Sequence, residues 1–138
     1  MKRAYVDANV ILRFITNDPP DMAERAARLF GLAEDGHIEL VVDEMVIAEV
    51  VWVLQSYYGF TADEIAPTLR SFLVSDSIIS DRKTELMQAL VLFEEKKVDF
   101  VDALAAVRMV ACGVTDIYSF DRHFDRLQGV RRLSPGGD

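Results

Sequence analysis

Four acidic residues of this 138-residue chain lie within short apolar stretches, and these are Asp7, Glu49, Asp102 and Asp121. A carboxylate in an apolar setting is costly unless it has a partner, and four such residues suggest that the partner is shared. A hard divalent cation held by oxygen ligands is the simplest partner of this kind. The pattern therefore predicts metal-assisted phosphoryl chemistry, with a nuclease as the leading candidate.

Crowded carboxylates repel one another, and a bound divalent cation removes that penalty. Mg²⁺ usually takes one or two protein carboxylates directly and keeps several waters, so these acids suffice for a site with one or two metals. Mg²⁺ or Mn²⁺ would activate a water and stabilise the leaving oxygen during in-line attack on a phosphate. The two histidines, His37 and His123, are too few for a His-rich zinc site.

Each acid also has a plainer structural role open to it. Asp7 and Asp121 suit helix or turn caps, and Glu49 suits an acid that pairs with an arginine or lies at a helix edge. Asp99 and Asp102 lie three residues apart, which suits an N-cap followed by a first-turn acid that favours the helix dipole. The metal hypothesis therefore depends on the coincidence of the acids and not on any one of them.

Polar residues near these acids are candidates for supporting roles. Asn9 and Ser119 are placed to orient ligands or waters. Basic residues that follow two of the acids are candidates for contacts to a phosphate backbone, namely Arg108, Arg122, His123 and Arg126. Arg108 suits pairing with a carboxylate equally well, and a solvated basic turn accounts equally well for the other three.

Strands and helices are predicted to alternate along the chain. β-rich stretches predict strands at residues 3–6, 38–42, 77–80, 116–120 and 130–133. Cap and break signals predict a short helix through residues 10–15, then helices that run from Pro19–Pro20 to about Glu34, from Asp43 to Tyr58, from Thr61 to about Val74, from Asp81 to Lys97 and from Asp99 to Cys112. Thr61 with Glu64 forms a capping box in this prediction.

This alternation predicts an α/β fold with a parallel sheet covered by helices on both faces. Sites in such sheets form outside the carboxyl ends of the strands. Asp7 and Asp121 follow predicted strands, and Glu49 and Asp102 lie early in predicted helices. The four acids are therefore expected to converge at that edge.

Composition predicts a single folded domain over residues 1–138, with residues 134–138 as a flexible tail. The net charge of -8 argues against general nucleic-acid binding, because proteins that bind phosphates are usually basic. Residues 101–138, however, hold five basic and five acidic residues, so a bound divalent ion would make this third locally positive. The global charge weakens the nuclease hypothesis without excluding it.

The compartment predicted for this chain is the cytoplasm. Cys112 is the single cysteine, so no internal disulfide forms, which fits a reducing compartment. The N-terminal residues indicate a strand and not a signal peptide, because Asp7, Asn9 and Arg13 interrupt the apolar run. No segment has the apolar length that a membrane span requires.

At these residues the chain resembles the PIN-domain proteins, specifically the VapC-type ribonuclease toxins of prokaryotic toxin–antitoxin pairs. The resemblance covers nearly the whole chain and is carried by four motifs. These are Val6-Asp7-Ala8-Asn9-Val10-Ile11-Leu12-Arg13, Ala48-Glu49-Val50-Val51-Trp52, Asp99-Phe100-Val101-Asp102-Ala103-Leu104 and Ser119-Phe120-Asp121-Arg122-His123-Phe124.

The resemblance implies a three-layer α/β/α fold with a central parallel sheet and Mg²⁺- or Mn²⁺-dependent endoribonuclease activity. Asp7, Glu49, Asp102 and Asp121 fall on the family's acidic quartet, and Asp99 falls on an acid found in some members. It further implies a homodimer, an RNA substrate and a cognate antitoxin that lays an amphipathic segment over the early helices. The aromatic residues of the N-terminal half suit such a partner, and they are Phe14, Trp52, Tyr57, Tyr58, Phe60 and Phe72.

Two other classes of function stay open on sequence alone. Asp7-Ala8-Asn9-Val10 resembles the nucleophile loop of haloacid-dehalogenase-type phosphatases, but Asn9 stands where a second Asp is needed and the partner Lys has no candidate. A response-regulator receiver is also a poor fit, since its acid pair and late Lys are absent. A non-catalytic module whose acids hold a structural metal or a basic peptide agrees with the net charge of -8.

Overall fold

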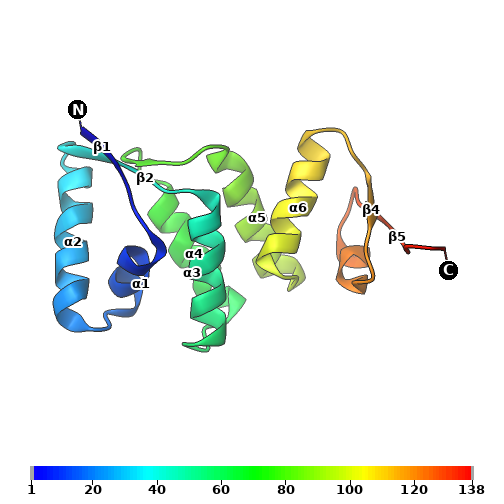
Figure 1. The fold of residues 1–138 in the computed structure, drawn as a ribbon, viewed down its shortest axis with the longest axis horizontal. Helices are drawn as coiled ribbons and strands as arrows, with labels where there is room; N and C mark the ends of the chain where they lie inside the picture. Colours follow the sequence, from blue (N-terminus) through cyan, green and yellow to red (C-terminus); the bar gives the residue numbers. More distant parts are fainter. Residues whose placement is uncertain (1, 138) are drawn as a thin grey trace. The chain divides into compact units, whose positions relative to one another are not determined.

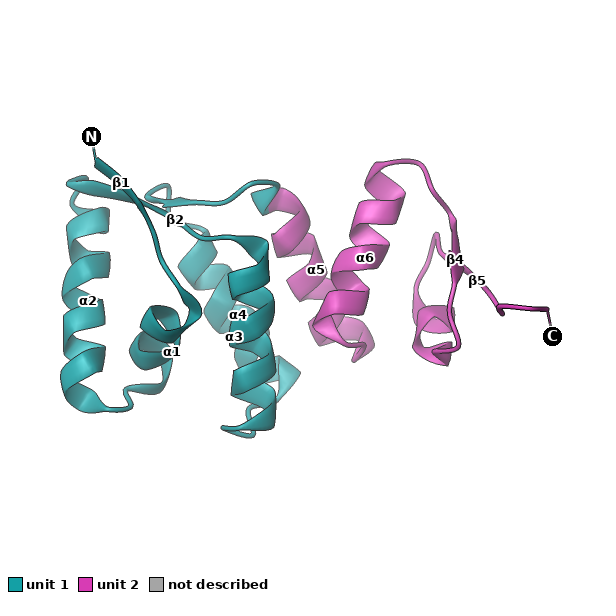
Figure 2. Cartoon of the chain, in the orientation of Figure 1, with its two compact units in different colours: residues 1–83 teal, residues 84–138 magenta. Residues whose placement is uncertain are grey.

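A computed structural model describes residues 2–137, and the chain divides into two compact units, residues 1–83 and 84–138 (Figure 2). Helices alternate with strands in the order predicted (Figure 1). The elements up to the unit boundary are β1 (Lys2–Tyr5), α1 (Ala8–Thr16), α2 (Pro20–Glu34), β2 (Ile38–Val41), α3 (Glu44–Ser56), α4 (Ala62–Leu73) and β3 (Ile78–Ile79). The remaining elements are α5 (Lys83–Lys96), α6 (Phe100–Ala111), β4 (Asp116–Tyr118), the 3₁₀ helix η1 (Arg122–Arg126) and β5 (Arg131–Leu133).

The first unit contains a three-stranded parallel sheet in the order β1-β2-β3. Lys2 pairs with Ile38 and Leu40 pairs with Ile78, so the carboxyl ends of these strands meet at one edge. Leu40 and Val42 are almost fully buried, and burial of such side chains is what holds a short sheet against its helices. Asp7 follows β1 at the edge where the strands end.

Capping signals set where the helices of the first unit begin. Asp43 accepts a hydrogen bond from the Met45 backbone N–H at 3.1 Å, so it caps α3 as predicted. Thr61 and Glu64 form the predicted capping box, in which the Glu64 carboxylate accepts from the Thr61 backbone N–H at 2.9 Å. α1 ends at Asn17, whose left-handed backbone (φ 54°) stops the helix.

The second unit contains a two-stranded parallel sheet of β4 and β5, in which Asp116 pairs with Arg131. Their side chains add a two-pronged ion pair, with Arg131 Nε and Nη2 donating to Asp116 at 2.9 and 2.8 Å. These bonds hold the pKa of Asp116 below its ordinary value. The aromatic core of this unit is an edge-to-face pair of Phe93 and Phe100, with ring centroids 6.1 Å apart.

Two details of the sequence prediction are corrected. Asp81 does not cap the fifth helix: α5 begins at Lys83 because Arg82 has a left-handed backbone (φ 55°), which a helix cannot continue through. Residues 122–126 form a 3₁₀ helix that no sequence signal predicted. Every strand pairing within each unit is parallel, as predicted.

Two further observations concern the C-terminal residues and the length of the helices. Residues 134–137 make a turn in which the Gly137 N–H donates to the Ser134 carbonyl at 3.1 Å, while Asp138, part of the predicted tail, lies outside the described residues. Within residues 2–137, every helix is too short or too polar to cross a membrane.

The capping box of α4 is expected to stabilise the fold measurably. Thr61→Ala removes the side-chain oxygen that accepts from the Glu64 N–H, and we expect it to lower the free energy of unfolding by about 1 kcal/mol. Glu64→Gln is the matched control, because an amide oxygen still accepts from the Thr61 N–H and the change should be smaller. Urea denaturation measures both, and equal losses in the two variants would contradict the assignment.

Candidate active site

The structure corrects the premise that the four acids are buried. No polar or charged residue within residues 2–137 is buried; Asp7, Glu49 and Asp121 are exposed, and Asp102 is half-buried. The error has a simple cause in helices. Neighbours in sequence point about 100° apart around the axis, so Ala48 and Val50 do not enclose the side chain between them.

In the first unit, Asp7 caps α1, as the alternative reading of this residue expected. Its Oδ1 accepts from the Val10 backbone N–H at 3.2 Å. Glu49 lies in the second turn of α3, a helix that packs against α1. It forms no ion pair with any residue of the range 2–137, so the arginine-paired alternative is wrong and the helix-edge alternative agrees with its exposure. Asn9 is exposed two residues beyond Asp7.

In the second unit, Asp99, Asp102 and Asp121 form a group that we term the acid triad. Partial burial raises the pKa of Asp102 above its ordinary value, and the negative charges of Asp99 and Asp121 raise it further, while His123 acts in the opposite direction. Asp99 occupies the N-cap position of α6, but its side chain makes no capping hydrogen bond. Asp102 therefore lies within electrostatic reach of two of the other predicted acids.

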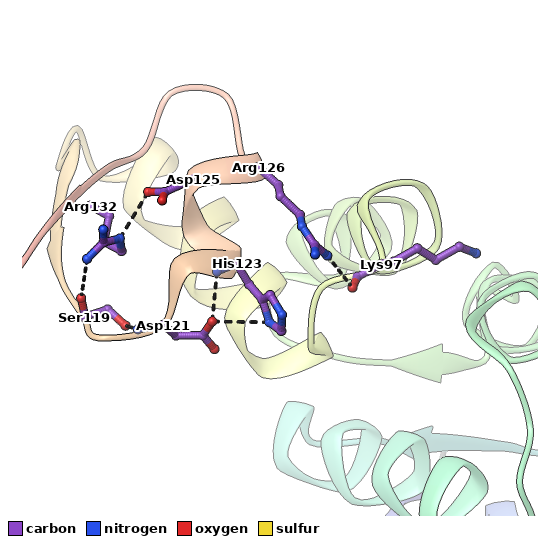
Figure 3. A network of polar contacts seen from close by, with 7 residues as sticks. All are labelled: Lys97, Ser119, Asp121, His123, Asp125, Arg126 and Arg132. Carbon is purple, nitrogen blue, oxygen red and sulfur yellow. Dashed lines mark hydrogen bonds and ion pairs between the residues drawn. The ribbon is translucent and has the colours of Figure 1, made fainter.

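Short polar contacts fix the turn that carries Asp121 (Figure 3). The Ser119 hydroxyl accepts from the Asp121 backbone N–H at 2.9 Å, and Asp121 Oδ1 accepts from the His123 backbone N–H at 2.9 Å. The His123 ring Nδ1 lies 3.3 Å from the same carboxylate oxygen. Asp121 thus serves as a cap through Oδ1, whereas its Oδ2 makes no hydrogen bond to the part of the chain that the structure describes.

Sequence reasoning missed Arg132, which ties this turn to β5 (Figure 3). Arg132 Nη1 donates to the Ser119 carbonyl at 3.0 Å, and its Nε donates to Asp125 at 3.1 Å. The Arg132 side chain is only 12% exposed, which is low for an arginine. Nothing in the local pattern of a short terminal strand marks this residue, because both of its partners lie at a distance in sequence.

The structure gives the four basic candidates different surroundings. Arg108 donates to Glu85 at 3.1 Å, which favours the carboxylate-pairing alternative for this residue. Arg126 donates to the Lys97 carbonyl at 3.3 Å, and His123 lies beside Asp121. Arg122 is exposed, and its guanidinium has no partner among residues 2–137.

The acids suit a divalent metal by their chemistry, although they do not form a complete cage. Within residues 2–137, no three His, Cys, Asp or Glu side chains are arranged so that they could hold a metal ion by themselves. Mg²⁺ needs only one or two protein carboxylates and fills its other positions with water. The acid triad offers such oxygen donors. Burial is the main cause of the raised pKa of Asp102, and a cation would relieve the further contribution from the charges of Asp99 and Asp121.

Comparisons with known proteins bear on the family of this chain. A family model described as the PIN domain matches residues 4–130, a range that runs through both units. The chain is also 25% identical over 130 residues to a protein named VapC ribonuclease from Aquifex aeolicus (strain VF5), covering 94% of this chain and 95% of that protein. The match supports the expected three-layer α/β/α fold class, with which the parallel pairing of the strands agrees.

Replacing Asp102 is expected to stabilise the metal-free protein at neutral pH. Because the folded-state pKa of Asp102 is raised, the folded chain binds more protons than the unfolded chain just above the ordinary pKa of an aspartate, and stability falls as pH rises through that window. Asp102→Asn should remove this fall. We would follow melting temperature against pH in EDTA.

The control for this prediction is Asp21→Asn, which removes a first-turn acid from α2. It should cost roughly 0.3–1 kcal/mol through loss of the favourable helix-dipole interaction. A destabilised Asp102→Asn protein at pH 7 would show that crowding at the acid triad is not a net cost.

Proposed function

The chain belongs to the PIN-domain family, and from this premise we propose that it is a metal-dependent endoribonuclease, the toxin of a VapBC-type toxin–antitoxin pair. The observation that carries the proposal is the extent of the family match. Residues 4–130 include every acid of the predicted quartet, in the predicted order. A likeness over 94% of the chain to a protein named as a VapC ribonuclease supports the same conclusion.

Asp7, Glu49, Asp102 and Asp121 are the proposed catalytic acids and metal ligands, with Asp99 as an additional ligand. When bound, Mg²⁺ or Mn²⁺ supplies an activated water and stabilises the leaving oxygen. The protein's own contribution is to hold the carboxylates without neutralising them. In Asp7 and in Asp121, one carboxylate oxygen accepts from a backbone N–H, and this hydrogen bond fixes the direction of the carboxylate. The second oxygen makes no hydrogen bond to residues 2–137 and is available to a ligand.

Residues around the acids have supporting roles in this proposal. Ser119 holds the backbone of Asp121, and Asn9 orients water or substrate beside Asp7. Arg122 contacts the phosphate backbone of RNA, because its charge is exposed and not engaged within the described chain. His123 and Arg126 contribute to the positive side of the same turn, and Arg108 chiefly balances Glu85.

The antitoxin is proposed to bind a groove of about 640 Å³ between α1, α2 and α4. Phe14, Phe30 and Phe72 line it. The Phe30 ring packs against Phe14 in a tilted arrangement and against Phe72 edge to face, with ring centroids 4.8 and 5.2 Å apart. Phe14 is 40% exposed, so apolar surface remains available to the apolar face of a partner helix. Phe14 and Phe72 belong to the set of aromatic residues that the sequence analysis assigned to a partner surface.

A homodimer and a cytoplasmic location are proposed with the same function. Both follow from the family resemblance, and the exposed single cysteine, Cys112, suits a reducing compartment. A non-catalytic acidic module and a phosphatase are the competing functions. An aspartyl-phosphate on Asp7 would indicate the phosphatase, and loss of partner binding without loss of activity would indicate the module.

Asp7→Asn is expected to abolish metal-dependent cleavage of RNA. The amide still caps α1 but loses the negative charge, and we expect the rate to fall by on the order of 10²-fold or more. Antitoxin-free protein would be incubated with pooled tRNA and rRNA in Mg²⁺, in Mn²⁺ and in EDTA. Asp35→Asn, an exposed acid at the end of α2, is the control and should cleave normally. Equal product from the Asp7→Asn and wild-type proteins would refute the catalytic assignment.

Mg²⁺ or Mn²⁺ is expected to raise the melting temperature, because the ion binds the folded acids and not the unfolded chain. A variant in which amides replace Asp7, Glu49, Asp102 and Asp121 should lose this response. A tenfold excess of metal over its Kd corresponds to about 1.4 kcal/mol of added stability. Differential scanning fluorimetry with a metal titration measures the shift, and a metal-independent melting curve in the wild type would argue against the site.

A further inference from the structure

We propose that the groove between α1 and α2 binds the phosphate backbone of the RNA strand next to Asp7, an inference that rests on the proposed nuclease function. The groove has a volume of about 520 Å³ and lies entirely within the first unit. The residues that matter to the argument are Asp7, Asn9, Arg13, Met22, Arg25 and Leu29, all of which line it.

Helical spacing explains why these residues share one groove. Asn9 and Arg13 are four residues apart on α1, while Met22, Arg25 and Leu29 are three and four residues apart on α2. Residues at these intervals lie on the same face of a helix. α1 and α2 pack against each other, so the two faces form opposite walls.

The groove is locally positive although the whole chain is negatively charged. The protein has a net charge of -8, yet the groove holds two arginines against one aspartate. Arg25 is exposed and its guanidinium has no partner among residues 2–137. The Arg13 guanidinium makes only a long hydrogen bond to residues 2–137, from Nη1 to the Asp18 carbonyl at 3.4 Å. Arg28, one turn beyond Arg25, is instead paired with Glu24 at 2.9 Å.

The guanidinium groups of Arg13 and Arg25 fit a phosphate ligand. Arginine offers several N–H donors in a planar fork that matches phosphate oxygens. Neither Arg13 nor Arg25 forms an ion pair with Asp7 in the described part of the chain, so their donors remain available to an external anion. Met22, which is 46% exposed, and Leu29 add an apolar surface on which a ribose or base can pack.

The position of Asp7 favours RNA over other anions. A phosphate held by Arg13 and Arg25 would lie in the same groove as a carboxylate that the proposed reaction uses. The groove would therefore align the strand with the acids while contributing to binding and not to chemistry. This predicts effects on affinity and KM, with kcat preserved.

The salt dependence of RNA binding tests this inference. The parent would be the full-length Asp102→Asn protein, which should not cleave, with fluorescently labelled bulk tRNA as the probe. The logarithm of the RNA association constant falls linearly with the logarithm of salt concentration, and each lost phosphate contact makes this negative slope shallower by roughly 0.7–0.9. Arg25→Gln and Arg13→Gln should each show this loss. Arg25→Lys should recover most of it, and Arg28→Gln should keep the parent slope.

Arg25→Gln is the decisive variant, because Arg25 is exposed and makes no side-chain hydrogen bond or ion pair within residues 2–137 that the substitution would remove. A parent-like slope in Arg25→Gln, or a parent that does not bind tRNA at low salt, would overturn the inference. In the otherwise wild-type enzyme, Arg25→Gln should raise KM for RNA and leave kcat unchanged. If Asp7→Asn abolishes cleavage while Arg25→Gln leaves binding and KM intact, the nuclease assignment stands and only the phosphate groove fails. If Asp7→Asn cleaves like the wild type, the nuclease assignment fails.

Discussion

The cost of keeping the half-buried Asp102 ionised, to which the charges of Asp99 and Asp121 add, is the constraint on which the proposed site of the second unit depends. Asp102 is in the first turn of α6, where the helix dipole favours its charge, yet its pKa is raised by partial burial and by the charges of Asp99 and Asp121. Groups that repel cannot hold one another in place. The neighbouring backbone therefore has to position them, and the caps, the Ser119 hydroxyl and the Arg132 guanidinium supply that support.

The first unit positions its acids by a different route. β1 and the start of α1 place Asp7 at the edge where the parallel strands end. α1 packs against α3, the helix that carries Glu49. In a parallel sheet the carboxyl ends of all strands lie at the same edge, so residues that follow different strands are placed near one another. α1 and α2 line two open grooves, one aromatic and shared with α4, the other holding two arginines. Under the proposals above, the first unit therefore offers one surface to an apolar partner and another to a polyanion.

What the sequence could predict depended on how local the determining interaction is. The Thr61–Glu64 box and the Asp43 cap are contacts within a few residues, and both are present as predicted. Asp81 failed as a cap because the backbone of its neighbour Arg82 is left-handed, a property that residue type alone does not reveal. Arg132 could not be found, since its partners are reached only through the fold. The expected burial of Glu49 was wrong because apolar neighbours in sequence are not neighbours around a helix axis. Asp7 and Asp121 are exposed at caps, where the sequence had also offered a capping role.

The double use of Asp7 and Asp121 changes how substitutions at these positions should be interpreted. In each, one carboxylate oxygen accepts from a backbone N–H that the helix itself leaves unsatisfied, and the other makes no hydrogen bond to residues 2–137. An alanine scan would remove both at once and report a sum of local unfolding and lost chemistry. Asparagine separates the two, because it caps a helix about as well as aspartate but carries no charge. The difference between the alanine and asparagine variants at one position is therefore a direct reading of the structural share of that residue.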